Sequence, residues 1–525
     1  MSRWNLPYHS QRPIVTASNV VSTSQPLASQ AGVRMLLDGG NAIDAALAAA
    51  IALTVLEPTG NGIGSDAFAL VWDAKELHGI NGSGRSPASW SLERFGHLDE
   101  MPKYGWDSVT IPGAVSVWSE LSQRFGRLPF QQLFGPAIEY ARGGFPVSPI
   151  IAGKWESAAE IYQGYDEFIR VFLPGGKPPS AGATFYLKEA ASTLEEICQT
   201  GGESFYRGDL ARMIARCSEE QGGGLKYTDL ASHQAEWVKP ISKQYRGMEL
   251  FELPPNGQGI AALIALGILD LFDLKQYPVD SVDSVHLQVE AMKLAFADVS
   301  CHLADIEAMK VDYRKMLDPG YLRQRADSID MTQSRSPVTG IPEGGGTVYL
   351  AAADADGMMV SFIQSNFNGF GSGIVVPGTG ISLNNRGCGF RVQDGHPNCV
   401  SGGKKPFHTI IPGFVMDRGK PLMAFGVMGA HMQAQGHVQM MTRIFDYGQN
   451  PQAASDAPRW HVMPESGLAL ENGFPLSVIQ GLKERGHEIF LEESDIFGGA
   501  QLILKSGNHY IAGSDHRKDG QPAGY

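Results

Sequence analysis

The sequence predicts a globular α+β protein in which a mainly helical first part is followed by a strand-rich second part. Of the 525 residues, 43% are apolar and 18% are charged, a balance that can fill a sizeable core and is unlike that of disordered chains. The 63 glycines recur in short clusters, so many turns need backbone conformations that glycine adopts most easily. We therefore expect loops and tight turns to carry the chemistry. Length alone leaves the number of domains open.

Helical periodicity dominates the first part of the chain. Residues 28–56 contain two helical patterns separated by Gly39 and Gly40, and the second is Ala-rich and apolar nearly all round, which predicts a buried core helix. Further amphipathic helices are expected at residues 115–124, 136–141, 190–199, 210–221, 258–272 and 282–304. The N-terminus lacks a signal-peptide pattern and no apolar run is long enough to cross a bilayer, so we expect a cytoplasmic protein that does not contact membranes.

The amino-acid composition changes after residue 330. Residues 331–346 are rich in Ser, Pro and Gly without apolar periodicity, which predicts an exposed linker. Two strands are expected next, at residues 347–354 and 358–365, joined into a hairpin by a short turn.

Charge and cysteine usage exclude several classes of protein. The net charge of −13 comes from acids and bases mixed along the chain, with no basic stripe that could neutralise phosphates, so we expect no nucleic-acid partner. The five cysteines are scattered without a CxxC pair, which favours reduced thiols. No group of His, Cys and acidic residues has ligand spacing, so we expect neither a metal nor an organic cofactor.

The junction between Gly346 and Thr347 could carry chemistry. If the peptide bond before Thr347 breaks, that residue gains an α-amine whose pKa lies near ~8, so one residue supplies both a hydroxyl nucleophile and a general base. The preceding glycines would permit the strained backbone in which the threonine hydroxyl attacks the carbonyl before it. Taken alone, residues 344–347 (GGGT) fit a flexible linker that enters an edge strand better than they fit a cleavage site. Only the surrounding motifs make cleavage the favoured interpretation.

Ordered motifs recur along nearly the whole chain. They include PLASQAGVRMLLDGGNAIDAALAAAIALTVLEPTGNGIG, IPGAVSVWSELSQRFGRLPFQQLFGPAIEYARGGFPV, YRGMELFELPPNGQG, the block that starts with TVYLAAADADG, GKKPFHTIIP, FGVMGAHMQAQGHVQ and the terminal GSDHRKDGQPAGY. In this order they resemble the gamma-glutamyl transpeptidase family. The resemblance implies a four-layer αββα sandwich of the N-terminal-nucleophile hydrolases. It also implies self-cleavage into a large fragment, 1–346, and a small fragment, 347–525, that stay associated as a heterodimer; whether two such heterodimers pair stays open.

The resemblance also implies roles for individual residues. The family's nucleophile falls on Thr347, and the threonine that orients it falls on Ser365, which keeps the hydroxyl. The two backbone amides of the family's oxyanion hole fall on Gly429 and Ala430, where N–H donors would stabilise a developing negative charge.

The departures from the family concern the substrate. Transpeptidases place acidic residues after an Asn pair to hold the α-amino group of the glutamyl substrate, but here Asn384 and its neighbour are followed by Arg386. The family's Ser-Ser pair becomes His408 and Thr409. Its asparagine beyond the helper threonine becomes Phe367, unless a small local shift lets Asn366 or Asn368 serve. A substrate ammonium would face a cation in this pocket, so glutamyl recognition is expected to be lost.

A carboxylate clamp is still expected. The family binds the substrate carboxylate with an arginine before an Ala-Pro turn, and here the nearest candidate is Arg85, two residues out of register. We predict Arg85 as this clamp, because a guanidinium fork suits a carboxylate. A surface arginine in a turn is the competing interpretation.

An enzyme that keeps the nucleophile and a carboxylate clamp but loses the amine site should hydrolyse a small amide that bears a carboxylate. The pattern of changes most resembles the oxamate amidohydrolase branch of the family, which converts oxamate to oxalate and ammonia in purine nitrogen catabolism. The alternatives are a gamma-glutamyl hydrolase or transpeptidase, a cephalosporin (glutaryl) acylase and, from another class, an uncleaved scaffold without catalytic activity.

Overall fold

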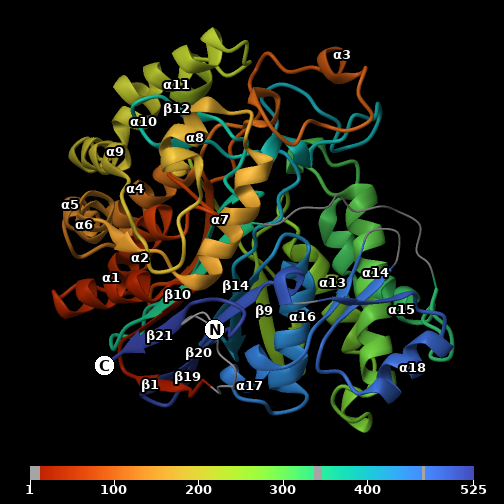
Figure 1. Ribbon diagram of the computed structural model, residues 1–525. Helices are drawn as coiled ribbons and strands as arrows, with labels where there is room; N and C mark the ends of the chain where they lie inside the picture. The colour runs from red at the N-terminus through yellow and green to blue at the C-terminus, as the bar shows by residue number, and fades with distance from the viewer. Residues whose placement is uncertain (1–11, 336–345, 464–466, 493) are drawn as a thin grey trace.

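Two seven-stranded β-sheets lie face to face between two layers of helices (Figure 1). The computed structural model describes residues 12–335, 346–463, 467–492 and 494–525. The arrangement confirms the four-layer αββα sandwich that the family resemblance implied. Within the described residues, no helix is both long and apolar enough to cross a membrane.

Neighbouring strands are antiparallel throughout both sheets. The first sheet consists, in spatial order, of β1 (Val15–Ala17), β20 (His509–Ser514), β19 (Gly499–Ser506), β15 (Lys420–Met428), β14 (Gly413–Asp417), β9 (Met248–Glu252) and β8 (Ile241–Tyr245). The second consists of β21 (Gln521–Gly524), β2 (Val20–Thr23), β10 (Gly346–Ala353), β11 (Met359–Phe367), β3 (Asp66–Trp72), β4 (Leu77–Asn81) and β7 (Glu236–Val238). The predicted hairpin is therefore β10 and β11, at the centre of the second sheet.

From Val348 onward strand β10 carries no charged residue, because both of its faces are buried. Side chains alternate between the faces of a strand. Leu350 and Ala352 accordingly pack with the helices outside the second sheet. Ala351 and Ala353 instead pack between the sheets.

Helix α2 (Ala42–Leu56) explains how one helical layer attaches to the second sheet. All of its residues are buried, as its Ala-rich sequence predicted. Asn41 accepts hydrogen bonds from the first turn and Asp44 accepts one from the Asn41 amide, so a capping box fixes where the helix begins. The carboxylate of Asp354, at the end of β10, accepts a hydrogen bond from the Ala42 amide at 2.8 Å. The start of the helix is therefore tied to the central hairpin.

The helices divide into two groups by the sheet that they cover. One apolar cluster joins the second sheet with α1 (Pro26–Leu37), α2 and α4 (Ala114–Phe125), and outside these with α6 (Gly135–Gly143), α9 (Lys188–Gln199) and α11 (Asp209–Glu220). A second cluster joins the first sheet with α13 (Gly259–Leu269), α14 (Val282–His302) and α16 (Met432–Phe445). The helices expected from periodicity are thereby confirmed, with ends that differ by a few residues.

Segments from before and after Thr347 alternate within both sheets. In the second sheet β10 and β11 lie between β2 and β3, which come from the first part of the chain. Of the predicted linker, residues 331–335 are half-buried or exposed, and residues 336–345 lie outside the described residues. The two parts of the chain share one core and could not separate without unfolding it.

A buried charge network ties the C-terminal segment to the rest of the fold. Asp515 accepts hydrogen bonds from Arg459 at 2.5 Å, from Arg517 at 3.0 Å and from the Ala500 amide at 2.7 Å. Arg517 also donates to Glu471 at 2.7 Å. Burial alone would raise the pKa of Asp515, but the two guanidinium groups outweigh it and hold the pKa well below its ordinary value. The carboxylate therefore stays ionised in the core.

We expect Asp515→Asn to lower the free energy of unfolding by about 3 kcal/mol, because the substitution leaves the buried Arg459 guanidinium without its carboxylate partner and leaves Arg517 with Glu471 alone. Urea unfolding at pH 7, followed by circular dichroism, measures the effect. Glu220→Gln is the control, since it removes only an exposed partner of Arg216 and should leave the midpoint unchanged. Equal effects of the two substitutions would contradict the role of the buried network.

Candidate active site

Thr347 is the second residue of β10 and is 6% exposed. Its Oγ1 lies 2.7 Å from the carbonyl oxygen of Gly346 and 3.2 Å from Ser365 Oγ. A Cβ at Gly60 would lie 3.2 Å from the Thr347 nitrogen, so glycine keeps space free at this position. The structure therefore brings together the predicted nucleophile, its helper hydroxyl and the carbonyl of the bond before it.

Ser365, on β11, is held so that its hydroxyl points at the Gly346 carbonyl. Its Oγ accepts hydrogen bonds from the Phe367 amide at 2.8 Å and from Arg386 Nη2 at 3.4 Å. Because both lone pairs of Ser365 Oγ accept hydrogen bonds, its hydroxyl group donates its own proton to the Gly346 carbonyl oxygen, 2.5 Å away. Phe367 adopts a positive φ of 82°, which is strained for a bulky residue. Ser365 thus polarises the carbonyl that the nucleophile would attack.

The predicted oxyanion turn lies between β15 and α16. Gly429 and Ala430 both have positive φ, of 117° and 49°. Within the described part of the chain, neither amide donates a backbone hydrogen bond. Gln258 Nε2 donates to the Ala430 carbonyl at 2.8 Å and to the Thr409 carbonyl at 2.7 Å, which holds the turn against the neighbouring segment. Both N–H groups are available for a developing oxyanion.

Arg386 is a fully buried cation beside the nucleophile. Its Nη1 donates to Thr409 Oγ1 at 2.8 Å, and its guanidinium stacks on the Phe367 ring at 4.2 Å. Burial lowers the pKa of Arg386 to about 10, so the side chain keeps its charge at neutral pH. Among the described residues no carboxylate lies within salt-bridge distance, and Nε has no hydrogen-bond partner. A buried guanidinium in this state is suited to an anionic ligand.

His408 and Asn384 are saturated by protein partners. The Ile410 amide donates to His408 Nδ1, so Nε2 carries the proton and donates to Asp66 Oδ2 at 3.0 Å. Burial raises the pKa of Asp66 to about 7, although Arg386 partly opposes this shift. Asn384 Oδ1 accepts from Thr110 Oγ1 and from the Arg386 amide, each at 3.0 Å. These contacts favour positioning roles for both residues over direct contact with a substrate.

Arg85 is engaged elsewhere. Its guanidinium donates to Asp305 at 3.2 Å, to Glu236 at 3.3 Å and to the Gly403 carbonyl, and the side chain is 34% exposed. It lines a pocket together with Glu236 and Lys405. Because protein carboxylates already hold Arg85, the geometry favours Arg386 over Arg85 as the carboxylate clamp.

Gln433, on α16, was missed by the sequence analysis. Its Nε2 lies 3.5 Å from Thr347 Oγ1, and its Oε1 accepts a hydrogen bond from the Ile411 amide at 3.0 Å. The second contact fixes the orientation of the amide, so the donor faces the nucleophile. Its place four residues after Gly429 was the only signal in the sequence, and it does not reveal which way the side chain points.

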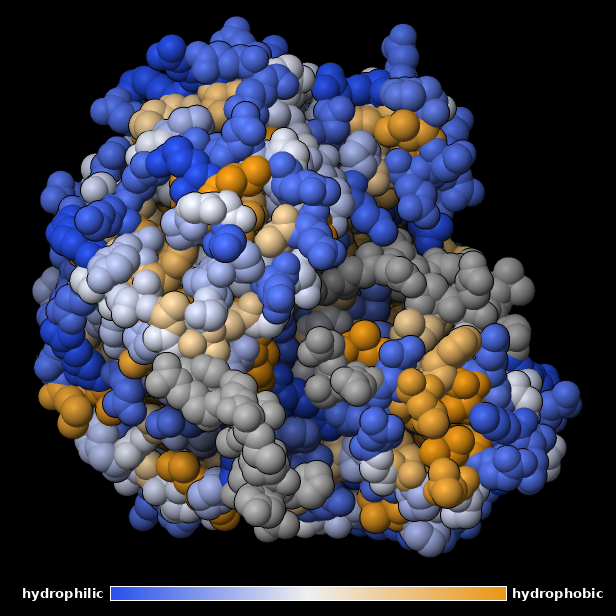
Figure 2. All heavy atoms as spheres, in the orientation of Figure 1, coloured by the Kyte–Doolittle hydropathy of each residue, from blue (hydrophilic) through white to orange (hydrophobic). Residues whose placement is uncertain are grey.

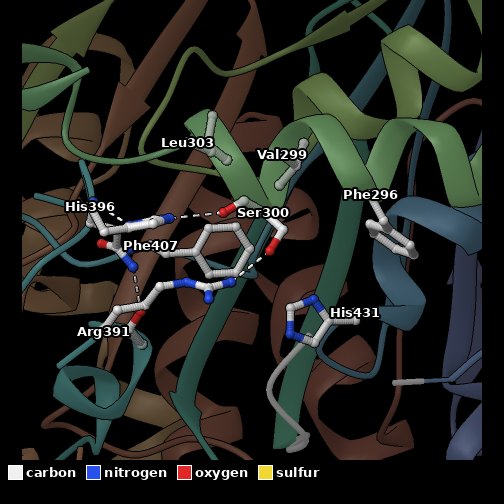
Figure 3. A pocket seen from close by; sticks show the side chains of 10 residues that line it. Phe296, Val299, Ser300, Leu303, Arg391, His396, Phe407 and His431 are labelled. Carbon is white, nitrogen blue, oxygen red and sulfur yellow. Dashed lines mark hydrogen bonds between the residues drawn. The ribbon is translucent and has the colours of Figure 1, made fainter. Parts of the chain in front are cut away.

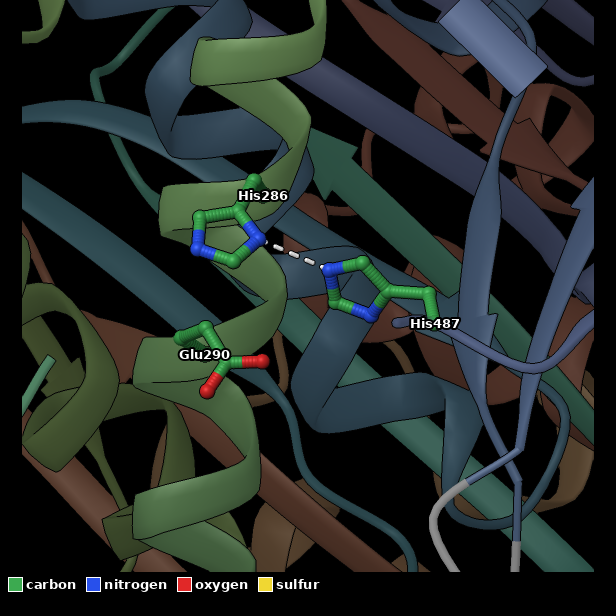
Figure 4. A group of neighbouring side chains, drawn as sticks. All are labelled: His286, Glu290 and His487. Atoms are coloured by element: carbon green, nitrogen blue, oxygen red, sulfur yellow. Dashed lines mark hydrogen bonds between the residues drawn. The ribbon is translucent and has the colours of Figure 1, made fainter. Parts of the chain in front are cut away.

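A second buried polar cluster joins distant segments of the chain (Figure 4). His286 Nδ1 lies 2.7 Å from His487 Nε2, and Glu290 lies one turn further along α14. Ligand spacing in the sequence does not reveal this group, because the two histidines are 201 positions apart. Lys293 donates to Glu290 at 2.9 Å, and His286 Nε2 contacts the Asp330 carbonyl at 2.8 Å. The Lys293 charge opposes a divalent cation here, so a structural role fits the cluster best.

The four-layer sandwich, with a threonine at the start of a central strand and a helper hydroxyl beside it, is typical of the N-terminal-nucleophile amide hydrolases. The chain belongs to the gamma-glutamyltranspeptidase family, whose profile, described as Gamma-glutamyltranspeptidase, matches residues 28–525.

Three relatives illustrate the range of the family. The chain is 35% identical to the "Glutathione hydrolase-like YwrD proenzyme" of Bacillus subtilis (strain 168), over 98% of this chain and 99% of that protein. It is also 35% identical to the "Oxamate amidohydrolase proenzyme" of Klebsiella pneumoniae, over 95% of this chain and 97% of that protein. The crystal structure of cephalosporin acylase from Bacillus halodurans matches with a TM-score of 0.95 and 46% identity, over 99% and 98% of the two chains. The chain is accordingly a hydrolase of amide bonds.

We expect Ser365→Ala to slow the cleavage of the single chain by about 100-fold, because the substitution removes a donor to the carbonyl under attack. Ser365→Thr keeps the hydroxyl and should cleave normally. Mass spectrometry of freshly purified protein over time measures the rate. Ser361→Ala is the matched control, since this buried serine of the same strand bonds Tyr349. Normal cleavage of Ser365→Ala would exclude the role assigned to Ser365.

Proposed function

We propose that the chain cleaves itself between Gly346 and Thr347 and then uses Thr347 as the nucleophile of an amidohydrolase. The contact of Thr347 Oγ1 with Ser365, and the hydrogen bond from Ser365 to the Gly346 carbonyl, support this proposal. The products, 1–346 and 347–525, would stay associated because both supply strands to each sheet. The "proenzyme" names of the two curated relatives agree with it.

The mechanism follows from the groups around Thr347. The Thr347 hydroxyl attacks the amide carbon, and its α-amine takes the hydroxyl proton and delivers it to the leaving nitrogen. The amides of Gly429 and Ala430 stabilise the oxyanion. Water, activated by the same amine, then hydrolyses the acyl-enzyme. Ser365 and Gln433 hold the hydroxyl in place for both steps.

The proposed substrate is a small amide that carries a carboxylate close to the reacting carbon. Arg386 is the observation that carries this proposal: it is buried, has no carboxylate within salt-bridge distance among the described residues and touches Ser365, which touches Thr347. A carboxylate held by Arg386 and Thr409 would therefore lie next to the scissile amide. This short separation favours oxamate, hydrolysed to oxalate and ammonia, and the oxamate amidohydrolase relative supports the same substrate.

A glutaryl amide is the second candidate. The match to a cephalosporin acylase over nearly the whole chain supports it. Its acyl group would need more space between Arg386 and Thr347 than oxamate does.

The intact mass of freshly purified protein under denaturing conditions tests the nucleophile. We expect the wild type to separate into two fragments at Gly346–Thr347 and Thr347→Ala to remain one chain, because the variant lacks the attacking hydroxyl. If the wild type stays whole, an uncleaved scaffold without catalytic activity would explain the protein better. Cleaved enzyme is then assayed with oxamate, glutaryl anilide and gamma-glutamyl anilide; turnover of the gamma-glutamyl compound alone would overturn the substrate proposal.

Substitution of each arginine tests which of them binds the substrate carboxylate. We expect Arg386→Lys to raise KM for oxamate by about tenfold or more, because lysine keeps the charge but loses the fork that binds a carboxylate through two hydrogen bonds. Arg85→Lys is the matched control and should leave KM unchanged. Steady-state kinetics of ammonia release measures both variants. The reverse result would restore Arg85 as the clamp.

A further inference from the structure

The carboxylate of Asp66 lies on the same face of the second sheet as the helper hydroxyl of Ser365. Asp66 is the first residue of β3 and is paired directly with Ser365 of β11 in the antiparallel ladder. Side chains of directly paired residues project from the same face of a sheet, with their Cβ atoms about 5 Å apart. Because Ser365 contacts Thr347, a single side chain separates Asp66 from the proposed nucleophile.

Three donors hold the Asp66 carboxylate in place. Its Oδ1 accepts hydrogen bonds from the Gly84 amide at 3.3 Å and from the Gly113 amide at 3.1 Å. Its Oδ2 accepts one from His408 Nε2 at 3.0 Å. Among the described residues no second donor reaches Oδ2, so one of its lone pairs is available for a proton.

His408 is held against Asp66 by its neighbours. The His408 ring packs on Phe68 with centroids 4.6 Å apart. The preceding ring, Phe407, stacks on His431 at 5.7 Å (Figure 3), and the cavity beside these two rings holds about 30 Å³. Burial keeps the pKa of His408 well below its ordinary value, so the ring stays neutral. A proton taken up by the pair therefore resides on Asp66.

The groups that face Asp66 from the surrounding elements are cationic or neutral. Arg386, from the short helix Arg386–Gly389, acts on it most strongly, and Lys405 acts on it less. Tyr206, on α10 (Glu203–Arg207), faces it as a neutral phenol, because burial raises the pKa of this tyrosine further above neutrality. The Asp66 carboxyl is therefore the negative group that balances Arg386.

Both members of this charge pair are removed from water. Hydrophilic side chains dominate the surface of the molecule (Figure 2), whereas Asp66 and Arg386 are fully buried. Burial raises the pKa of Asp66 to about 7, with Arg386 opposing part of the shift. At neutral pH the carboxyl is consequently divided between its charged and neutral forms.

We infer that Asp66 sets the charge of the carboxylate site: it balances Arg386 when the site is empty and takes up a proton from solvent when a substrate carboxylate binds. The inference rests on the proposed function, since that proposal assigns the substrate carboxylate to Arg386. Two anions beside one buried guanidinium repel each other, so the ligand favours the protonated carboxyl. Uptake of one proton with one carboxylate leaves the net charge of the site unchanged.

The test measures binding of oxalate, the proposed product, to the cleaved enzyme by isothermal titration calorimetry in two buffers that differ in ionisation enthalpy. Oxalate stays ionised at neutral pH, so protons taken up on binding go to the protein. We expect uptake of about half a proton per site at about pH 7.5. The Kd for oxalate should rise about tenfold between about pH 6.5 and about pH 8.5, because ionised Asp66 competes with the ligand for Arg386.

Asp66→Asn fixes the neutral form of the side chain. We expect this variant to bind oxalate without proton uptake, with a Kd independent of pH, and about tenfold tighter than the wild type at about pH 8.5. The α-amine of Thr347 titrates in the same range, and uptake by that amine would persist in Asp66→Asn. Asp66→Ser, which also lacks the charge, replaces this variant if Asp66→Asn does not fold.

Glu252→Gln is the matched control. Glu252 is also buried and also lies beside a histidine, with Oε1 2.6 Å from His437 Nδ1. This variant should show the proton uptake and the pH dependence of the wild type. A purely structural role of Asp66 would instead make Asp66→Asn bind oxalate more weakly at every pH, a result that overturns the inference.

The outcomes separate the inference from the proposed function. If oxamate is hydrolysed but oxalate does not bind, or binds with no proton uptake or with uptake that persists in Asp66→Asn, the inference is overturned and the proposed function stands. If oxamate is not hydrolysed but oxalate binds with uptake that Asp66→Asn abolishes, the inference stands and the oxamate proposal fails. If oxamate is not hydrolysed and oxalate does not bind, both are overturned.

Discussion

Two residues of β11 face a single residue of β10 at Thr347, and this bulge decides where the nucleophilic hydroxyl lies. Gly346 pairs with Phe367 and Val348 with Gln364, so the ladder shifts register across Thr347. A bulge re-aims side chains that a regular ladder would send to fixed faces. Here it brings the Thr347 and Ser365 hydroxyls within hydrogen-bonding distance at the point where the chain enters the sheet. The carbonyl, the nucleophile and the helper hydroxyl all take their positions from this irregularity.

Electrostatics around the bulge follow from one buried cation. Arg386 opposes the burial that raises the pKa of Asp66 and contributes to keeping His408 neutral. It also donates to Ser365. Asp66 is the carboxyl that acts most on Arg386, but among the described residues no carboxylate lies within salt-bridge distance, so the buried cation can still pair with an anionic ligand. Arg386 therefore contacts the residue proposed to assist self-cleavage and is also the residue proposed to bind the substrate carboxylate.

The interleaved topology explains how a chain could be cut at its centre without loss of structure. Strands β10 and β11 lie between strands of the first part, and β8 and β9 complete the sheet formed mainly by the second part. Cleavage before Thr347 would free an amine at the end of a central strand, where Gly60 leaves space beside the nitrogen.

The sequence by itself determined the features that local periodicity encodes, namely the helical segments and the β10–β11 hairpin, while the roles of Thr347 and Gly429 were implied only by the family resemblance. The helices and the hairpin follow from side-chain spacing and from backbone conformations that few residues adopt. Only the tertiary structure shows that Asp305 and Glu236, more than a hundred positions away in sequence, pair with Arg85, which favours Arg386 as the proposed carboxylate clamp. It also placed Gln433 on the nucleophile. Burial and charge pairing between distant segments have no local signature, since they arise only once the two sheets have packed together.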